Sequence, residues 1–469
     1  MASVTATSST HTARRLSRSS GDARPAAPVR IAHLGLGNFF RAHQAWYTEH
    51  APDAPDWGIA AFTGRTPVLA DAMGLQDGLY TLVTQRPDGD DYEVVSSVSA
   101  VHAASEHEAW LGYLRSPDLA LVTLTVTEAG YARGADGSLD VARPDVADDI
   151  TVLSADPLAV VDTVPARLVA GLLARRAAGS GPVSIVPCDN LPDNGAVAAR
   201  VVRGFADAVD PTLASWIDAN VSFVTTMVDR ITPRPTDDVE RAVLAATGCE
   251  DAAPVVTEPF SEWVLAGEFL AGHPGWDAVG ARIVDDVTPF EQRKLWLLNG
   301  AHSLLAYAGS IRGHETVAEA IGDPVCRAWV EEWWDESSRY LTLPPDEVAA
   351  YRAALLERFT NPRMRHLLAQ IATDGSLKLP VRIVPTLRGV RSAGRMPAGA
   401  VRILAAWVCH LRGAGAPAAD PAATVLVPLA AGPLPDAVPA VLHHLDRALA
   451  SDAGLVAAVI TSAHDLMGS

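Results

Sequence analysis

The stretch Val29–Gly37, VRIAHLGLG, decides the fold of the first half of the chain. It is a short apolar run that ends in glycines, and a helical pattern follows it as far as His50. This order predicts a buried strand, a tight turn and a helix. Gly35-Leu36-Gly37 is half of a dinucleotide-binding fingerprint: the first glycine permits the turn, and the second lets a pyrophosphate approach the helix N-terminus. Phe40 stands where a third glycine is expected, and a glycine pair alone is also typical of an ordinary turn.

The same alternation of strand and helix continues along the chain. The clearest apolar runs are WGIAAFTG (57–64), LALVTLTVTEAGY (119–131), VSIVPCDN (183–190) and VSFVTTMVD (221–229). Strands that alternate with helices predict an α/β fold with a doubly wound parallel sheet. After Pro289 the segments are helical, with scarcely any strand signal; those predicted as helices are 289–309, 324–340, 347–359 and 397–411.

Three regions are therefore predicted. Residues 1–28 form a disordered tail, residues 29–285 a Rossmann-type dinucleotide-binding domain, and residues 286–469 a mostly α-helical substrate and catalytic domain. The tail is rich in Ser, Thr, Arg and Ala and has no apolar core, which argues against a secretory signal. Its composition is also compatible with an organellar transit peptide.

The composition favours a folded cytoplasmic protein. Its 469 residues fit two domains, and a formal net charge of −18 argues against a nucleic-acid or anionic-membrane partner. No apolar run reaches the roughly 18 residues that a membrane span needs. The four cysteines are dispersed, which favours a reducing compartment over disulfides or a zinc site. We expect a monomer or a small homo-oligomer.

The cofactor is predicted from the first two strand ends. Gly35, Gly37, Asn38 and Phe39 open the first helix and are candidate contacts. After the second strand, FTGRTP offers Arg65 where an acidic residue usually binds the ribose of NAD. An arginine there could accept a 2′-phosphate, so NAD is predicted and NADP stays open.

The catalytic signal begins with lysine, which occurs only at Lys294 and Lys378 among 37 basic residues. Elsewhere arginine supplies the charge, so the lysines are candidates for chemistry that requires loss of a proton. Lys294 lies in FEQRKLWLLNGAHSLLAY (290–307), a predicted buried helix. At about 100° per residue, Lys294, Asn299 and His302 fall within an arc of about 140° on one face. Their grouping predicts general acid/base chemistry at a carbonyl–alcohol centre.

Other polar residues follow predicted strands or turns. Asn190 in CDNLPDNG and Asp229 in MVDRITP end strands, where ligands collect in open α/β sheets. Lys378 follows the turn sequence Asp374-Gly375-Ser376, so it is expected in a loop, as a donor to substrate hydroxyls or as a plain surface charge. The motifs HExxH, GxxxxGK[ST] and GxSxG are absent from the sequence, and no metal is predicted.

Taken together, the motifs resemble the mannitol dehydrogenase family of polyol-specific long-chain dehydrogenases. The segments that carry the resemblance, in order between about residues 29 and 390, are GLGNFFRAHQAWYTEH, LTVTEAGY, PCDNLPDNG, MVDRITP, PFEQRKLWLLNGAHSLLAY and IATDGSLKLP. The resemblance implies a Rossmann-type domain, a helical C-terminal domain and zinc-independent hydride transfer between a nicotinamide nucleotide and C2 of a ketose or ketose-like acid.

The resemblance also implies a role for individual residues. Lys294 would be the catalytic base and acid, and Asn190 and Asn299 would hold the reacting oxygen. Asp229, His302 and Lys378 would contact the substrate. Glu291 and Glu128 would relay the proton.

The substrate is open at this stage. D-mannitol and D-fructose are the first pair expected, with fructuronate reductase and mannitol-1-phosphate 5-dehydrogenase as alternatives. Gln370 and Arg382 look more like the fructuronate reductase branch, whereas PCDNLPDNGAV looks more like the mannitol branch. An acidic substrate would need a cationic pocket, for which Arg382, Arg388 and Arg391 are candidates. A nucleotide-binding sensor without turnover is the hypothesis from a different class.

Overall fold

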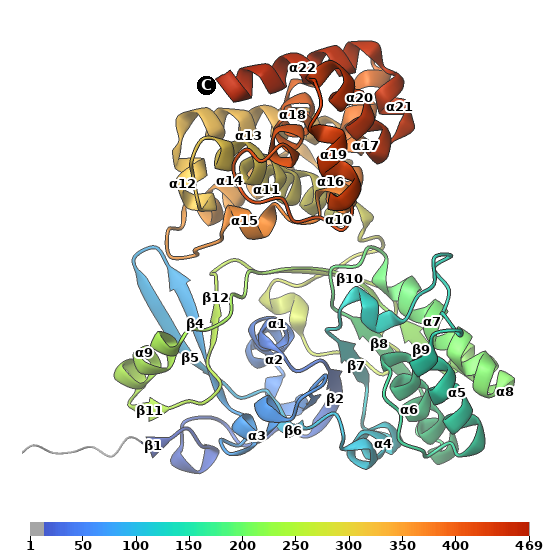
Figure 1. The fold of residues 1–469 in the computed structure, drawn as a ribbon. Helices are drawn as coiled ribbons and strands as arrows, with labels where there is room; N and C mark the ends of the chain where they lie inside the picture. The colour runs from blue at the N-terminus through green and yellow to red at the C-terminus, as the bar shows by residue number, and fades with distance from the viewer. Residues whose placement is uncertain (1–13, 469) are drawn as a thin grey trace, which may run out of the picture. The chain divides into compact units, whose positions relative to one another are not determined.

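The computed structural model describes residues 14–468, and the chain divides into two compact units, Met1–Val287 and Thr288–Ser469. Figure 1 shows the first unit as strands flanked by helices and the second as helices. Within the described residues, no helix is both long and apolar enough to cross a membrane.

The first unit is built on a six-stranded sheet in which every neighbouring pair is parallel. Its order is β6-β3-β2-β7-β8-β9, with bounds β2 (Val29–Leu34), β3 (Gly58–Phe62), β6 (Val98–His102), β7 (Leu121–Leu124), β8 (Val183–Pro187) and β9 (Val221–Phe223). If these six strands are numbered 1 to 6 along the chain, their order across the sheet is 3-2-1-4-5-6, which is the Rossmann arrangement. The predicted fold class is confirmed.

Both faces of this sheet are buried. Ala32 and Leu34 of β2 pack into one apolar core, while Ile31 packs into the other, because side chains alternate along a strand. The helices of the unit are α1 (Asn38–Ala42), α2 (Gln44–His50), α3 (Val68–Gly74), α4 (His107–Arg115), α5 (Pro144–Ala155), α6 (Val164–Ala178), α7 (Asn194–Val209), α8 (Pro211–Asn220) and α9 (Asp237–Thr247).

Smaller sheets complete the unit. β4 (Tyr80–Arg86), β5 (Gly89–Val95) and β12 (Val255–Thr257) form one, and β10 (Thr225–Asp229), β13 (Glu262–Ala266) and β14 (Arg282–Ile283) form another. The run 221–229, read as one strand in the sequence, is thus two strands in two sheets.

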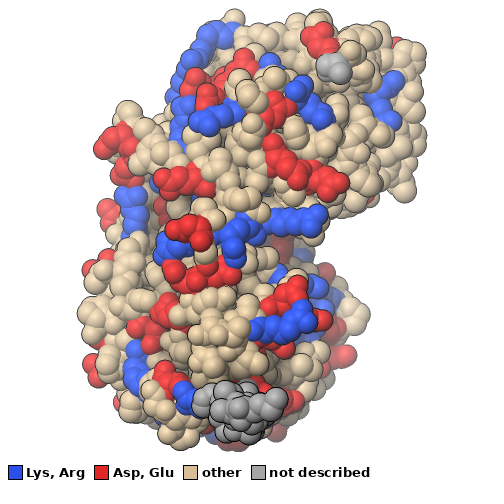
Figure 2. Space-filling view, turned by 90° about the vertical axis from the view of Figure 1, so that its left-hand side faces the viewer, with Lys and Arg blue, Asp and Glu red and all other residues tan. Residues whose placement is uncertain are grey.

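Figure 2 shows acidic and basic side chains interspersed on one face of the molecule.

The N-terminal segment differs from the expectation of a tail that is disordered through residue 28. Arg14–Arg15 forms β1, which pairs with β11 (Cys249–Glu250), and Leu16 is buried. Arg18 donates to the carbonyl oxygens of Ser96 and Val98 at 2.7 and 2.8 Å. Side-chain bonds to distant backbone leave no local pattern, so composition could not reveal them. Residues 1–13 of the predicted tail lie outside the described range.

The second unit is helical. A long helix runs through α10 (Thr288–Arg293), the π-helical turn η5 (Lys294–Asn299), α11 (Gly300–Leu304) and the π-helical turn η6 (Leu305–Gly309). The others are α12 (Val317–Gly322), α13 (Pro324–Ser337), α14 (Pro345–Thr360), α15 (Leu368–Ile371), α16 (Gly375–Arg382), α17 (Val384–Ser392), α18 (Ala398–Leu411), α19 (Ala423–Ala430), α20 (Leu434–Leu445), α21 (Arg447–Ser451) and α22 (Ala453–Gly468). The four predicted helical segments are all helical in the structure, apart from residues at their ends.

Candidate active site

The turn after β2 requires a glycine at its first position. Gly35 has φ +109°, and a Cβ there would lie 2.2 Å from the carbonyl oxygen of Thr125, which follows the neighbouring strand β7. Thr125 Oγ1 also donates to the Gly35 carbonyl oxygen at 2.7 Å. The two strand ends therefore approach each other too closely for any side chain.

The second glycine keeps space beside the helix start. Gly37 is the N-cap of α1, and among the described residues, its chain neighbours aside, only the Gly35 carbonyl oxygen would lie within 4 Å of a Cβ there, at 3.5 Å. The residues fit a pyrophosphate, because this N-terminus is not filled by protein atoms. Asn38 Oδ1 accepts a hydrogen bond from Arg41 Nη2 at 2.8 Å, and the Phe39 ring stacks on His43 at 5.0 Å.

Phe40, at the place of the missing third glycine, fills space that a glycine would leave for close packing of helix and strand. Its ring stacks on the buried His33 ring with centroids 3.6 Å apart. The two nitrogens of His33 are bonded to the hydroxyls of Thr123 and Thr125 at 2.8 and 3.1 Å. Burial lowers the pKa of His33 to about 3, so this ring is neutral. Arg65 is exposed in the loop between β3 and α3.

Three predicted site residues of the first unit lie at carboxyl ends of strands. Glu128 begins the 3-10 turn η3 (Glu128–Tyr131) after β7, Asn190 follows β8, and Asp229 is the last residue of β10. Asp229 is buried and Asn190 is exposed. The Glu128 carboxylate, 71% exposed, pairs with Arg133 at 2.5 Å. A role for Glu128 in proton transfer therefore competes with this ion pair.

Two contacts that the sequence did not indicate fix the loop that carries Asn190. The buried Tyr131 hydroxyl donates to the carboxylate of Asp189. Burial raises the pKa of Asp189, and burial together with Asp189 raises that of Tyr131 well above its usual range. Asn194 is fully buried; it donates to the Thr226 carbonyl oxygen at 3.0 Å and accepts from the Thr226 N–H at 2.9 Å. The loops after β7 and β8 and strand β10 are thus held together. The one sign of these contacts in the sequence is the repeated Asp-Asn pair in CDNLPDNG.

In the second unit, Lys294 and Asn299 are the first and last residues of η5. The N–H of Gly300 bonds to the Leu295 carbonyl oxygen, five residues back, which is the π-helical pattern. Residues five apart therefore lie closer to one another around the helix axis than they would in an α-helix. The arc of about 140° expected from a regular α-helix is wrong here, and Lys294 and Asn299 are better aligned than predicted.

Two adjacent tryptophans of α13 bind this π-helical turn. In a regular α-helix, the N–H of Gly300 would bond to the Trp296 carbonyl oxygen. Instead Trp333 Nε1 donates to that oxygen at 2.8 Å, and Trp334 Nε1 donates to the Leu297 carbonyl oxygen at 2.9 Å. Both indoles are buried, so the changed backbone register is supported from outside the helix.

His302 lies one turn after Asn299 and is only 7% exposed. Its Nε2 has no hydrogen-bond partner among the described residues. Burial, with the positive charges of neighbouring side chains, lowers the pKa of His302 well below its usual value. The ring lies edge-on to His366 with centroids 5.1 Å apart. A neutral imidazole with an unused nitrogen can bind a hydroxyl group of a ligand. Glu291, half-buried, lies on α10 one turn before Lys294.

Lys378 is helical, contrary to the expected loop position. Asp374, with φ +58°, is the N-cap of α16, so the turn sequence begins this helix. Lys378 Nζ donates to the carbonyl oxygens of Thr373 and Ile371 at 2.6 and 3.3 Å, and lies 3.7 Å from Asp374 Oδ2. Burial and then Arg382 lower the pKa of Lys378.

The three arginines proposed for a cationic pocket separate in the structure. Arg388 pairs with Asp446, and Arg391 pairs with Asp452. Arg382, at the end of α16, instead donates from Nη1 to the Asn299 carbonyl oxygen at 3.3 Å and to Ser303 Oγ at 3.2 Å. Only Arg382 of the three contacts the helix that carries Lys294.

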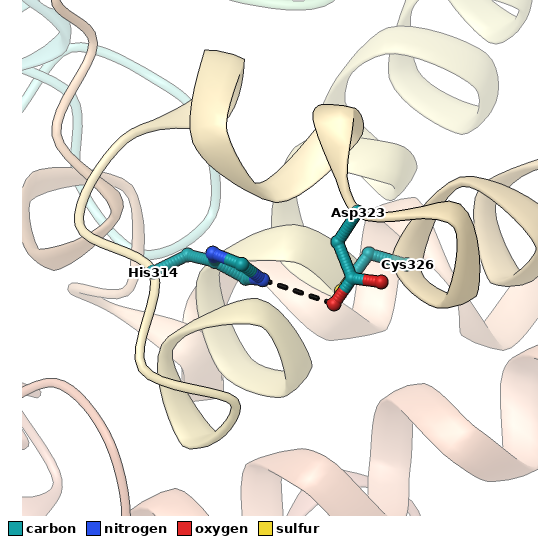
Figure 3. Close-up of side chains that lie close together, drawn as sticks. All are labelled: His314, Asp323 and Cys326. Carbon is teal, nitrogen blue, oxygen red and sulfur yellow. Dashed lines mark hydrogen bonds and ion pairs between the residues drawn. The ribbon is translucent and has the colours of Figure 1, made fainter.

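A second polar cluster lies in the same unit (Figure 3), formed by His314, Asp323 and Cys326, whose ligand atoms lie within 4.8 Å of one another. Asp323 Oδ2 accepts from His314 Nε2 at 3.0 Å and from Arg312 Nε at 2.7 Å. Asp323 Oδ1 caps α13 by accepting from Val325 N at 2.8 Å. Burial raises the pKa of the Cys326 thiol to about 12. The carboxylate is already satisfied, so the cluster serves as a helix cap.

Comparison with known proteins places these features in one family. Residues 29–278 match the mannitol dehydrogenase Rossmann domain, and residues 286–466 match the mannitol dehydrogenase C-terminal domain. The chain belongs to the mannitol dehydrogenase family. It is accordingly a polyol dehydrogenase, an oxidoreductase that acts on CH–OH groups with a nicotinamide dinucleotide. The sensor hypothesis is set aside.

Several relatives illustrate the range of the family. The chain is 40% identical to D-mannonate oxidoreductase of Escherichia coli, covering 76% of this chain and 75% of that one. It is 38% identical to D-arabinitol 4-dehydrogenase of Ralstonia nicotianae, covering 82% and 84%. The structure of Pseudomonas fluorescens mannitol 2-dehydrogenase with NAD and D-mannitol matches with a TM-score of 0.77 and 33% identity, over 94% of this chain and 92% of that one.

Proposed function

We propose that this protein catalyses reversible hydride transfer between a nicotinamide dinucleotide and C2 of a polyol and its ketose, with Lys294 as general base and acid. The observation that carries this proposal is the alignment of Lys294 and Asn299 at the two ends of one π-helical turn. A proton acceptor and an amide donor on one helix face are the groups that an alcohol carbon needs as it becomes a carbonyl carbon.

Each residue has one task in this scheme. The dinucleotide, bound at Gly35 and Gly37, supplies or accepts the hydride. Lys294 takes the hydroxyl proton during oxidation and returns it during reduction, which an amine can do and a guanidinium cannot. Asn190 and Asn299 donate hydrogen bonds to the oxygen that carries negative charge in the transition state.

The remaining candidates bind hydroxyls or move protons. His302 offers the unused Nε2 to a substrate hydroxyl, and Asp229 and Lys378 bind further hydroxyls. Glu291 exchanges the proton between Lys294 and solvent, with Glu128 as the second carboxylate of this route. Metal ions have no part in the scheme.

Two substrate pairs share this chemistry and differ in one terminal group. D-mannitol and D-fructose are the pair expected first from the sequence, and a relative of known structure was solved with D-mannitol. D-mannonate and D-fructuronate carry a carboxylate instead of one terminal alcohol. The contact of Arg382 with the helix of Lys294 favours this second pair, as does the 40% identity to a D-mannonate oxidoreductase.

NAD is the proposed cofactor. The same solved relative carries NAD. Arg65 is exposed beside the predicted ribose site, where it is available to a 2′-phosphate, so NADP is the alternative to be measured.

The test is oxidation of NADH and of NADPH by the purified protein with D-fructose, D-fructuronate and D-fructose 6-phosphate in parallel wells. The reverse reaction is measured with D-mannitol, D-mannonate and D-arabinitol. Reduction of at least one ketose with a strict requirement for Lys294 is the expected result. A wild-type protein that binds NADH but reduces none of these substrates would contradict the proposed function.

A further inference from the structure

The guanidinium of Arg382 is only partly used by the protein. Its hydrogen bonds within the described residues come from Nη1 alone and go to two neutral acceptors, the Asn299 carbonyl oxygen and Ser303 Oγ. Burial lowers the pKa of Arg382 to about 10, which leaves it charged at neutral pH. A partly buried guanidinium with unused donors lies beside Asn299, a residue of the proposed chemistry.

Two buried arginines of the same chain, Arg175 and Arg230, are bonded differently. Arg175 also binds only neutral acceptors, but it uses Nε, Nη1 and Nη2 on six carbonyl oxygens. Arg230 likewise donates from all three nitrogens to carbonyl oxygens. These arginines are structural, because every edge of the guanidinium is satisfied. Arg382 lacks this pattern.

Two neighbouring histidines are incompletely satisfied as well: His302, whose pKa is lowered partly by Arg382, and His366, whose ring lies edge-on to that of His302. His302 Nε2 and His366 Nδ1 are buried and have no hydrogen-bond partner among the described residues. Burial lowers the pKa of both rings, and the causes that follow it are positive neighbours: His366, Arg358 and Arg382 for His302, and Arg358 for His366. Unsatisfied buried polar atoms cost stability unless a ligand binds them.

An acidic group is close to this cluster but is engaged elsewhere. Asp374 acts on the pKa of Arg382, yet its carboxylate lies 3.7 Å from Lys378 Nζ and accepts from Thr373 Oγ1 at 3.2 Å. Tyr307, the other group that acts on Arg382, is buried, and burial raises the pKa of its hydroxyl above the usual value. Arg382 is thus a cation bonded to Ser303, and the carboxylate that acts on its pKa lies beside Lys378 instead.

We propose that Arg382, together with His302 and His366, binds the carboxylate of a sugar acid, which makes the acid a better substrate than the neutral polyol or ketose. Arg382 presents its free edge to the two carboxylate oxygens, since a guanidinium binds a carboxylate through paired N–H donors. The imidazoles donate to the remaining lone pairs or to the neighbouring hydroxyl. This inference rests on the proposed function and identifies Arg382 as a specificity-determining residue.

The test compares kcat/KM for D-fructuronate and D-fructose in wild type, Arg382→Gln and Arg382→Lys. Arg388→Gln is the matched control, because Arg388 lies six residues away and pairs with Asp446 instead. We expect Arg382→Gln to lower kcat/KM for D-fructuronate by at least about 30-fold, mainly through KM, and to leave D-fructose nearly unchanged. Arg382→Lys should recover part of the loss, and Arg388→Gln should match wild type.

Equal losses for both substrates would overturn the inference and make Arg382 a support of Asn299. A selective loss with D-fructose 6-phosphate, but not with D-fructuronate, would also overturn it, since the subsite would then serve a phosphate. If Arg382→Gln does not fold, thermal protection of wild type with NAD decides: D-mannonate must protect at lower concentration than D-mannitol. Failure of the proposed function is distinguishable, because wild type would then reduce neither ketose.

Discussion

The two units position their predicted site residues by opposite means. In the first unit, Glu128, Asn190 and Asp229 come from separate strand ends, and side-chain contacts such as Asn194 with Thr226 hold these ends together. In the second, Lys294 and Asn299 belong to one helix, and a change of backbone register aligns them. A substitution that breaks these contacts in the first unit should therefore disturb several segments at once. A substitution that disturbs the π-helical turn of the second unit should change the alignment of residues within one helix.

The largest effect is expected at Lys294. Lys294→Ala should lower kcat by about 10³-fold or more, because it removes the proposed proton acceptor. Lys294→Arg should be nearly as inactive, since a guanidinium keeps its proton. Steady-state kinetics with the best substrate of wild type measure the loss, and NADH binding by fluorescence should stay unchanged. Substantial turnover by either variant would show that the helix carries a different catalyst.

The second effect concerns the tryptophans that support η5. Trp333→Phe removes the indole donor to the Trp296 carbonyl oxygen, so the turn should relax and misalign Lys294 and Asn299. We expect kcat to fall by up to about 100-fold with little change in KM. Trp329→Phe, on the same helix but only half-buried, is the matched control. An unchanged kcat in Trp333→Phe would mean that the π-helical turn holds its register without this bond.

The corresponding change in the first unit is Asn194→Ala. It removes both hydrogen bonds to the Thr226 backbone and leaves buried polar groups unsatisfied. The free energy of unfolding should fall by about 1–3 kcal/mol, measured by urea denaturation, and KM should rise as the Asn190 loop loosens. Asn220→Ala, which loses one bond to the Trp216 carbonyl oxygen at 2.9 Å, should cost less. If both variants lose the same stability, the contact is not the clamp that we describe.

The smallest effect is the dependence of stability on pH through His33. Its folded pKa of about 3 lies below the unfolded value of about 6.5, so below pH 6.5 the unfolded chain binds more protons. Stability from this group is complete above pH 6.5 and falls by about 1.4 kcal/mol per pH unit as the pH drops toward 3. Urea denaturation at pH 7, 6 and 5 should show that the free energy of unfolding falls less steeply with decreasing pH in His33→Asn than in wild type. The exposed His464→Asn should behave as wild type, and parallel slopes for all three proteins would rule out this role.

The sequence was informative where structure follows from local pattern. Alternating strands and helices were enough for the Rossmann unit, and Gly35 was identified because a tight turn needs a residue that tolerates positive φ. The helix of Lys294 was predicted from its start signals, with Thr288 as N-cap, Pro289 at the first helical position and Glu291 at the third. Each of these features depends on residues that are close together in the chain.

Features that depend on distant partners were missed. The π-helical turn could not be foreseen, because its carbonyl oxygens are bound by tryptophans 37 residues away. Residues 14–28 were predicted from their composition to belong to a disordered tail. Composition could not reveal the hydrogen bonds of Arg18 to backbone about 80 positions further along. Asn190 and Asn194 have similar neighbours in sequence, and only burial distinguishes them. The roles of the site residues remain predictions.

The helix of Lys294 contains two π-helical turns, η5 and η6, and this makes its length as important as its composition. A π-helical turn is one residue longer than the α-helical turn that it replaces. Deleting a single residue within 294–299 would restore a regular α-helical turn and leave the residues that follow in phase, but the present spacing of Lys294 and Asn299 would be lost. In evolutionary terms, this helix can change by substitution, but insertions and deletions within it should be selected against.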